Sequence, residues 1–120
     1  MIPSINRRHV EHYVLGSIIN GNISMPLDAM EFAEMNIDYK LFKSTYSTKL
    51  IAKAIHNMKN EGLPVDDVLL KSYIDSKTNK LDNMEYFEII CAGTGSYLSV
   101  LNYLDLLKRI DREEKLWSRI

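Results

Sequence analysis

One amphipathic stretch, residues 45–66, constrains the fold of this chain more than any other part of it. Its apolar residues recur with helical spacing, at Leu50, Ile51, Ala54, Ile55 and Met58. This spacing places one apolar stripe along a helix, so Ile51 and Ile55 are predicted to point into a buried core. Ser44 or Ser47 can cap the start of this helix, because a hydroxyl oxygen there accepts a free backbone N–H.

A turn of specific chemistry follows this helix. Gly62 supplies the left-handed residue that ends it. Leu63 is pushed out of the helical region because Pro64 follows it. Asp66 is then predicted to be the N-cap of a second helix, over residues 67–74. Gly62, Pro64 and Asp66 are therefore expected to be structural residues.

The residues before these two predicted helices also have helical spacing. Residues 6–20 form a predicted helix, and Gly16 inside it indicates either a close crossing by another helix or tolerated slack. A further helix opens near Pro26, since proline is favoured in a first helical turn. A single turn over residues 38–42 is expected to place Phe42 in the core.

The C-terminal part continues the helical pattern. A polar loop over residues 75–82 leads to a short helix capped by Asn83, and a Gly/Ser break separates it from a final helix. No alternating run indicates a strand. The sequence predicts an all-α fold of about six helices packed as a compact orthogonal bundle. It is divided into a globular domain (1–95) and a long helix (96–120).

The last helix is longer than a compact domain of this size needs. Its roughly 25 residues would span about 37 Å at 1.5 Å per residue. Leu104 and Leu107 give it an apolar side, and Leu116 and Trp117 extend that side among charges such as Arg112. A lone projecting helix cannot bury these two residues. Either the helix docks on a partner, or the chain stops partway through a larger unit.

Composition excludes several classes of protein. The chain has 120 residues and a net charge of −1, which makes no electrostatic case for binding nucleic acid. The single cysteine cannot form an internal disulfide, which is typical of a reducing compartment. The N-terminus lacks the apolar run of a signal peptide, and no stretch approaches the length of a membrane span. We expect a soluble, cytoplasmic protein with no membrane contact.

The sequence shows no complete set of chemically active residues. His9 and His12 lie one turn apart, but no third metal ligand stands at a convincing spacing. The Gly/Ser run at residues 93–96 lacks the lysine of a phosphate-binding loop. Cys91 has apolar neighbours and is interpreted as a small core residue, and Glu85, with Glu88, is expected on a solvated face. We therefore expect no catalytic, cofactor-binding or metal-binding residue.

The order of the motifs resembles a known family. Residues 10–19 contain the pattern Glu-x-x-Val-Leu-Gly-Ser, matched at Glu11, Val14, Leu15, Gly16 and Ser17. Residues 50–58 are similar to an apolar helix of that family, and the turn at Phe42 to its Asp-Phe-Tyr element. Glu-Gly-Leu-Pro-Val-Asp at residues 61–66 is the most specific match. The chain resembles the N-terminal domain of the bacterial replicative DNA helicase, the hexameric DnaB type.

This resemblance implies a non-enzymatic assembly domain. In that family the domain dimerises and forms a collar in the hexamer. It also contacts the primase and, in many bacteria, a helicase loader or initiator. ATP and magnesium would belong to the motor domain of a parent 5′–3′ DNA helicase, and DNA would not be bound directly. Residues 96–120 would be the first arm of a helical hairpin. The expected interface residues are Leu104, Leu107, Arg112, Leu116 and Trp117.

Other interpretations stay open at this stage. The main alternative is a helicase-binding helical module of a primase or helicase loader. An unrelated helical nucleic-acid-binding protein is disfavoured by the net charge, and a small enzyme has no supporting residue set.

Overall fold

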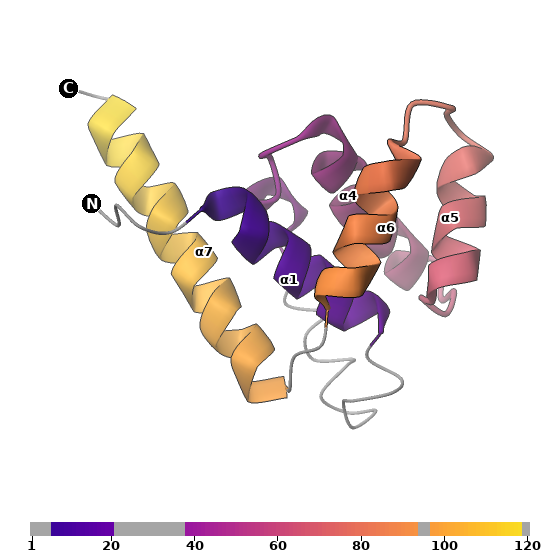
Figure 1. Cartoon of the computed structure of the whole chain (residues 1–120), viewed down its shortest axis with the longest axis horizontal. Helices are drawn as coiled ribbons and strands as arrows, with labels where there is room; N and C mark the ends of the chain where they lie inside the picture. The colour runs from indigo at the N-terminus through magenta and orange to yellow at the C-terminus, as the bar shows by residue number, and fades with distance from the viewer. Residues whose placement is uncertain (1–5, 21–37, 94–96, 119–120) are drawn as a thin grey trace.

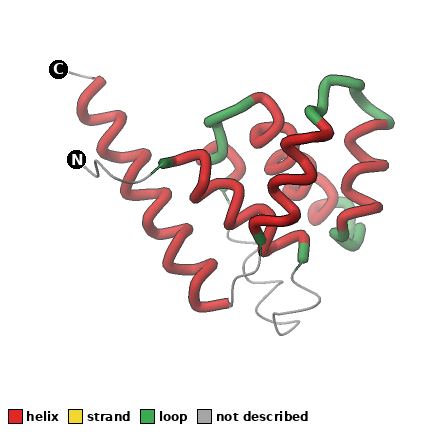
Figure 2. The backbone as a smooth tube through the Cα atoms, viewed as in Figure 1, coloured by secondary structure: helices red, strands yellow, loops and turns green. Residues whose placement is uncertain are grey.

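The computed structural model describes residues 6–20, 38–93 and 97–118, and in these ranges every regular element is helical. The elements are α1 (Arg7–Ile19), the 3-10 turn η1 (Tyr39–Leu41), α4 (Tyr46–Asn60), α5 (Asp67–Asp75), α6 (Asn83–Ala92) and α7 (Tyr97–Ser118). Figures 1 and 2 show their arrangement. The all-α prediction is confirmed for the described residues. They hold five α-helices where the sequence predicts about six, and the helix expected near Pro26 lies outside them.

Helix α4 carries the predicted core stripe. Ile51, Ile55 and Met58 are buried. The N-cap is Thr45, and neither Ser44 nor Ser47 takes that role. The Thr45 hydroxyl accepts from the Thr48 backbone N–H at 3.0 Å, while the Thr48 hydroxyl accepts from the Thr45 N–H at 3.1 Å. This reciprocal capping box satisfies two backbone donors, whereas an N-cap hydroxyl alone satisfies one.

The turn after α4 has the geometry that its residues favour. Gly62 has a φ of +73°, where an added side chain is strained. The Leu63 N–H donates to the Met58 carbonyl at 2.9 Å, which closes the end of the helix. Pro64 then leads to Asp66, whose carboxylate accepts from the Leu69 N–H at 2.8 Å as the N-cap of α5.

Helix α1 lies at the centre of the fold, against α6, α7 and α4. Its closest neighbour is α6, because Gly16 meets the backbone of Gly93 at the crossing of the two helices (Figure 1). A Cβ at Gly16 would lie 2.0 Å from the carbonyl oxygen of Ile89. The side-chain amide of Asn20 donates to the carbonyls of Ile90 and Gly93 at 2.8 and 3.1 Å. Of the two explanations for Gly16, the structure shows the close crossing.

The buried and exposed faces of helix α6 differ from those predicted from the sequence. Its N-cap is Asp82, and Asn83 is the first helical residue. Glu85, expected on a solvated face, is buried, whereas Cys91, expected in the core, is exposed. The side that faces α1 is set by the glycine crossing, so it turns Glu85 and Ile89 inward and leaves Cys91 outside.

Helix α7 packs its first half on the body of the fold. Val100, Leu104 and Leu107 are buried in the same cluster as Phe42, which is almost fully buried beside η1. In the ranges that the structure describes, no helix combines the length and apolar character that crossing a membrane requires.

Candidate protein-interaction site at the end of α7

A cluster of ion pairs fixes α7 against the start of α1. Arg7 is its centre, and this side chain is only 11% exposed. It donates to the Leu41 carbonyl at 2.7 Å, to Asp111 Oδ1 at 3.1 Å and to Glu11 Oε2 at 3.0 Å. It also donates to Glu114 on the next turn of α7. One guanidinium therefore joins α1, η1 and α7.

The buried carboxylate of Asp111 forms ion pairs with two lysines in addition to Arg7. The Lys43 Nζ lies 2.7 Å from Asp111 Oδ1, and the Lys115 Nζ lies 3.0 Å from Oδ2. Burial acts to raise the pKa of Asp111, but the hydrogen bonds from Lys43, Lys115 and Arg7 outweigh it and hold that pKa well below its usual range. Burial likewise acts to lower the pKa of Arg7, but its hydrogen bond with Asp111 and the charge of Glu114 raise it. Both groups therefore stay charged at neutral pH.

Glu11 extends this cluster to the segment after η1. Its carboxylate is fully buried, and it accepts from the Ser44 N–H at 3.2 Å and from the Ser44 hydroxyl at 2.6 Å as well as from Arg7. A buried carboxylate is stable only with partners of this kind. Ser44 therefore anchors the loop between η1 and α4 to helix α1.

A second polar contact begins at His12, the residue after Glu11. His12 Nε2 is 2.9 Å from Glu85 Oε2, and the Thr45 hydroxyl donates to the same oxygen at 2.6 Å. His12 and Glu85 are both buried, although the sequence predicts a solvated face for Glu85, and His9 is exposed. Among the described residues, no group of three or more His, Cys, Asp or Glu side chains can hold a metal ion.

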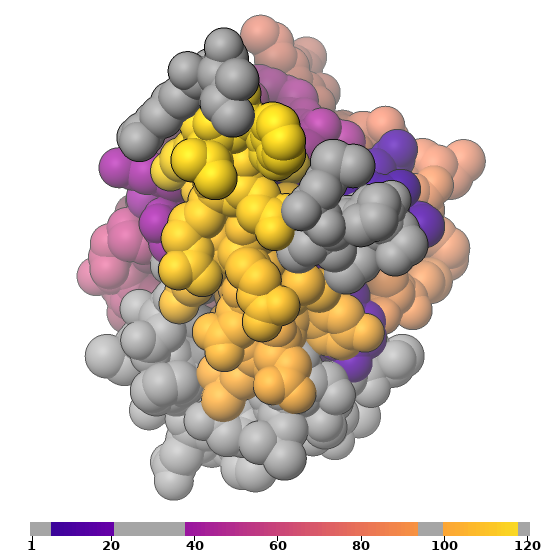
Figure 3. All heavy atoms as spheres, turned by 90° about the vertical axis from the view of Figure 1, so that its left-hand side faces the viewer, coloured from indigo at the N-terminus to yellow at the C-terminus, as the bar shows by residue number. Residues whose placement is uncertain are grey.

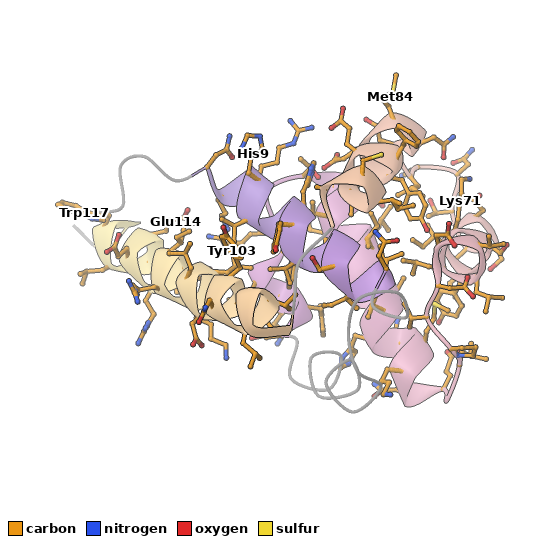
Figure 4. All side chains as sticks on the ribbon, turned by 60° about the horizontal axis from the view of Figure 1, so that its bottom comes forward. His9, Lys71, Met84, Tyr103, Glu114 and Trp117 are labelled. Atoms are coloured by element: carbon orange, nitrogen blue, oxygen red, sulfur yellow. The ribbon has the colours of Figure 1, made fainter. Side chains whose placement is uncertain are left out.

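Beyond the Arg7 cluster, the end of α7 carries two large apolar side chains on the surface. Leu116 is 60% exposed and Trp117 is 58% exposed, with Arg112 exposed one turn earlier. Figure 3 shows α7 running along this side of the molecule. In Figure 4, Trp117 lies at the tip of the helix and points away from the body. An exposed tryptophan near an arginine is a combination that is enriched in protein interfaces.

The other two expected interface residues lie inside the fold. Leu104 is 4% exposed and Leu107 is fully buried, because both pack in the cluster that includes Val14 and Leu15 of α1. Their contacts are used within the chain, so we restrict the candidate site to Arg112, Leu116 and Trp117.

The charged residues that build the cluster were not predicted, although one sequence signal points to them. Asp111 continues the spacing of Val100, Leu104 and Leu107, and Glu11 shares a face with Val14. A carboxylate on an otherwise apolar stripe implies a buried cationic partner.

Comparison of the chain with protein-family models, with curated proteins and with solved structures finds no match.

Proposed function

We propose that this chain is a non-enzymatic assembly domain that self-associates through the end of α7. The observation that carries the proposal is that the ion pairs of Arg7 fix α7 directly before its exposed apolar end. The Arg7 cluster holds α7 at Asp111 and Glu114, and Leu116 and Trp117 follow directly on the outside. A helix fixed in this way presents its apolar tip without the entropic cost of ordering it on binding.

The resemblance to the N-terminal domain of DnaB-type helicases makes the proposal more specific. In this chain the matching residues have structural roles that such a motif needs: Glu11 is the buried acceptor of the ion cluster, Gly16 is the helix crossing, and Asp66 caps α5. These roles support a compact orthogonal bundle with α7 as the first arm of a helical hairpin.

On this proposal, the chain belongs to an ATP-dependent replicative helicase of the bacterial cytoplasm and forms part of its dimeric and hexameric collar. Primase and a helicase loader or initiator would bind the same domain. ATP and magnesium would act in a separate motor domain, and DNA would not contact the bundle. The reading frame beyond Ile120 tests this, because it should encode a phosphate-binding loop of the G-x-x-x-x-G-K-[ST] type. A primase-type or loader-type sequence there would favour the alternative function.

Sedimentation equilibrium tests the interface itself. The chain should associate reversibly and weakly, and Trp117→Ala should reduce that association because an aromatic anchor is lost. Tyr46 on α4 is the matched control, since it is also an exposed aromatic, at 54%. Tyr46→Ala should leave association unchanged. If both variants associate like the parent chain, the tip of α7 is not the interface.

A further inference from the structure

Helices α4 and α5 pack against each other, and two surface hollows lie where they meet. The first hollow encloses about 310 Å³ and is lined by Ala54 of α4 and Ile74 of α5, among others. The second encloses about 380 Å³ and is lined by Met58 of α4 and Leu69 of α5, among others. Tyr73 lines both hollows. The two hollows therefore form one continuous depression with Tyr73 as its divider, which we call the α4–α5 groove.

The second hollow is apolar along nearly all of its lining. Met58, Leu63, Pro64, Leu69 and Tyr73 form it together with one serine, and none of these residues carries a charge. Leu63 and Leu69 are 42% and 43% exposed. Single exposed apolar residues are normal on a protein surface, but exposed residues that line one hollow indicate a binding groove.

The side chain of Tyr73 is held in place between the two hollows. Its hydroxyl donates to the Glu61 carboxylate at 3.0 Å, and the Lys77 Nζ lies 4.8 Å from the centroid of its ring. A side chain fixed at both its hydroxyl and its ring loses little freedom when a partner binds. The groove is therefore formed before any partner arrives.

The first hollow is basic. Its charged lining residues are Lys53 and Lys77, and no carboxylate is among the described residues that line it. In the part of the chain that the structure describes, neither lysine forms an ion pair. The nearby carboxylates are already used, since Asp75 pairs with Lys71 at 2.6 Å and Glu61 accepts from Tyr73. Helix α4 as a whole carries three lysines and no acidic residue.

We propose that the α4–α5 groove binds an acidic amphipathic helix of another protein. A helix of this kind presents apolar side chains at i, i+4 and i+7 on one face, and these would fill the hollows on either side of Tyr73. Carboxylates beside the first anchor would pair with Lys53 and Lys77. A cavity of about 150 Å³ holds a benzene ring, so each hollow has room for one leucine or phenylalanine side chain.

This surface is separate from the proposed site of self-association. In Figure 1, α5 and α7 lie at opposite ends of the molecule. A chain can therefore hold a helical partner in the groove while the end of α7 contacts a second copy. Failure of either proposal leaves the other standing.

A pair of synthetic peptides of opposite charge tests the groove. Each is a stapled helix of about 14 residues, or four turns, with leucines at i, i+4 and i+7. One carries glutamates at the flanking positions and the other carries lysines. The glutamate peptide should bind with a Kd of about 0.1–1 mM and shift the backbone amide NMR signals of Ala54, Leu69 and Ile74. The lysine peptide should bind at least about tenfold more weakly. Equal binding of the two peptides, or no binding of the glutamate peptide, overturns the proposal.

Surface variants separate the charge of the groove from its apolar lining. Lys53→Glu should weaken the glutamate peptide about tenfold and strengthen the lysine peptide. Lys108→Glu is its matched control, because it makes the same change of net charge at an exposed position of α7. Leu69→Ala should weaken both peptides, whereas Val68→Ala should weaken neither, because Val68 lines neither hollow of the groove. Equal losses from Lys53→Glu and Lys108→Glu would show that net charge, and not the groove, attracts the peptide.

Two other occupants would give different results. A single-stranded oligonucleotide that shifts the same amide signals more strongly than the glutamate peptide would overturn a helical protein partner. A second copy of the chain in the groove would shift the Ala54 and Ile74 signals when the chain alone is diluted, and this also overturns the proposal. Signals that stay constant on dilution and move only with the glutamate peptide support it.

Discussion

Replacing Gly16 by alanine sets helix propensity directly against packing. By propensity alone, alanine inside α1 should stabilise the chain by about 1 kcal/mol. The added Cβ, however, would lie 2.0 Å from the Ile89 carbonyl oxygen and 2.8 Å from the Gly93 backbone nitrogen. Both contacts are with backbone atoms, so no change of side-chain rotamer relieves them.

The size of the effect follows from the separation that the new methyl group requires. Ordinary contact begins at 3.4 Å, so α1 and α6 must move apart by about 1.4 Å at the crossing. That movement loosens the buried Leu15 and Ile89 and strains the two hydrogen bonds of the Asn20 amide. Overpacking costs typically about 1–3 kcal/mol, and a backbone clash belongs at the upper end. After the propensity gain is subtracted, we expect a net loss of about 2 kcal/mol.

Urea unfolding followed by circular dichroism measures this loss as a lower midpoint. Gly62 is the matched control, because nothing surrounds its side and only its φ of +73° requires glycine. Asparagine tolerates that conformation, so Gly62→Asn should be nearly neutral, whereas Gly16→Asn should be worse than Gly16→Ala. A midpoint for Gly16→Ala equal to or above that of the parent chain would refute the close crossing.

Three further predictions concern the core, a helix cap and the ion cluster. Ile55→Ala should lower the free energy of unfolding by about 2–5 kcal/mol because the side chain is fully buried. Lys53→Ala, on the exposed side of the same helix, should change it by less than about 0.5 kcal/mol. Equal losses in urea unfolding would contradict this assignment of the two faces. Asp66→Ala should lose about 1 kcal/mol, while Asp66→Asn keeps a capping oxygen and should be nearly neutral, as differential thermal unfolding would show. The folded pKa of Asp111 is depressed, so its contribution to stability is present above its unfolded pKa of about 3.9 and declines as the pH falls through the folded value. Urea midpoints measured across that acid range should fall more steeply for the parent chain than for Asp111→Asn, and parallel curves would exclude a role for this carboxylate.

The parts of the fold that follow from local pattern were predictable from sequence. Ile51 and Ile55 repeat with the helical period, Gly62 and Pro64 determine a turn by their own backbone limits, and Asp66 caps the next helix. Each of these features depends on residues within a few positions in the chain. Local chemistry was therefore sufficient to predict them.

The caps of α4 and α6 were assigned to neighbours of the true N-caps, Thr45 and Asp82. The other errors concern residues whose environment is set from far away in the sequence. Glu85 is buried because His12 and Thr45 reach it from 73 and 40 residues away. Cys91 is exposed because the crossing at Gly16 fixes which side of α6 faces inward. No periodicity within the ten residues of α6 contains that information. The Arg7 cluster was missed for the same reason.

The central position of α1 has a consequence for how the chain folds during its synthesis. Helix α1 is synthesised before α6 and α7, which are its main partners. Asn20 bonds Ile90 across 70 residues, and Arg7 bonds Asp111 across 104. At about 5–20 residues per second, α1 waits about 4–14 s for α6 and longer for α7. During that time the apolar residues of α1 are not yet buried by α6 and α7. Folding of this helical protein therefore depends on contacts between residues far apart in the sequence. Slow translation of the second half of the chain should increase aggregation and capture by chaperones.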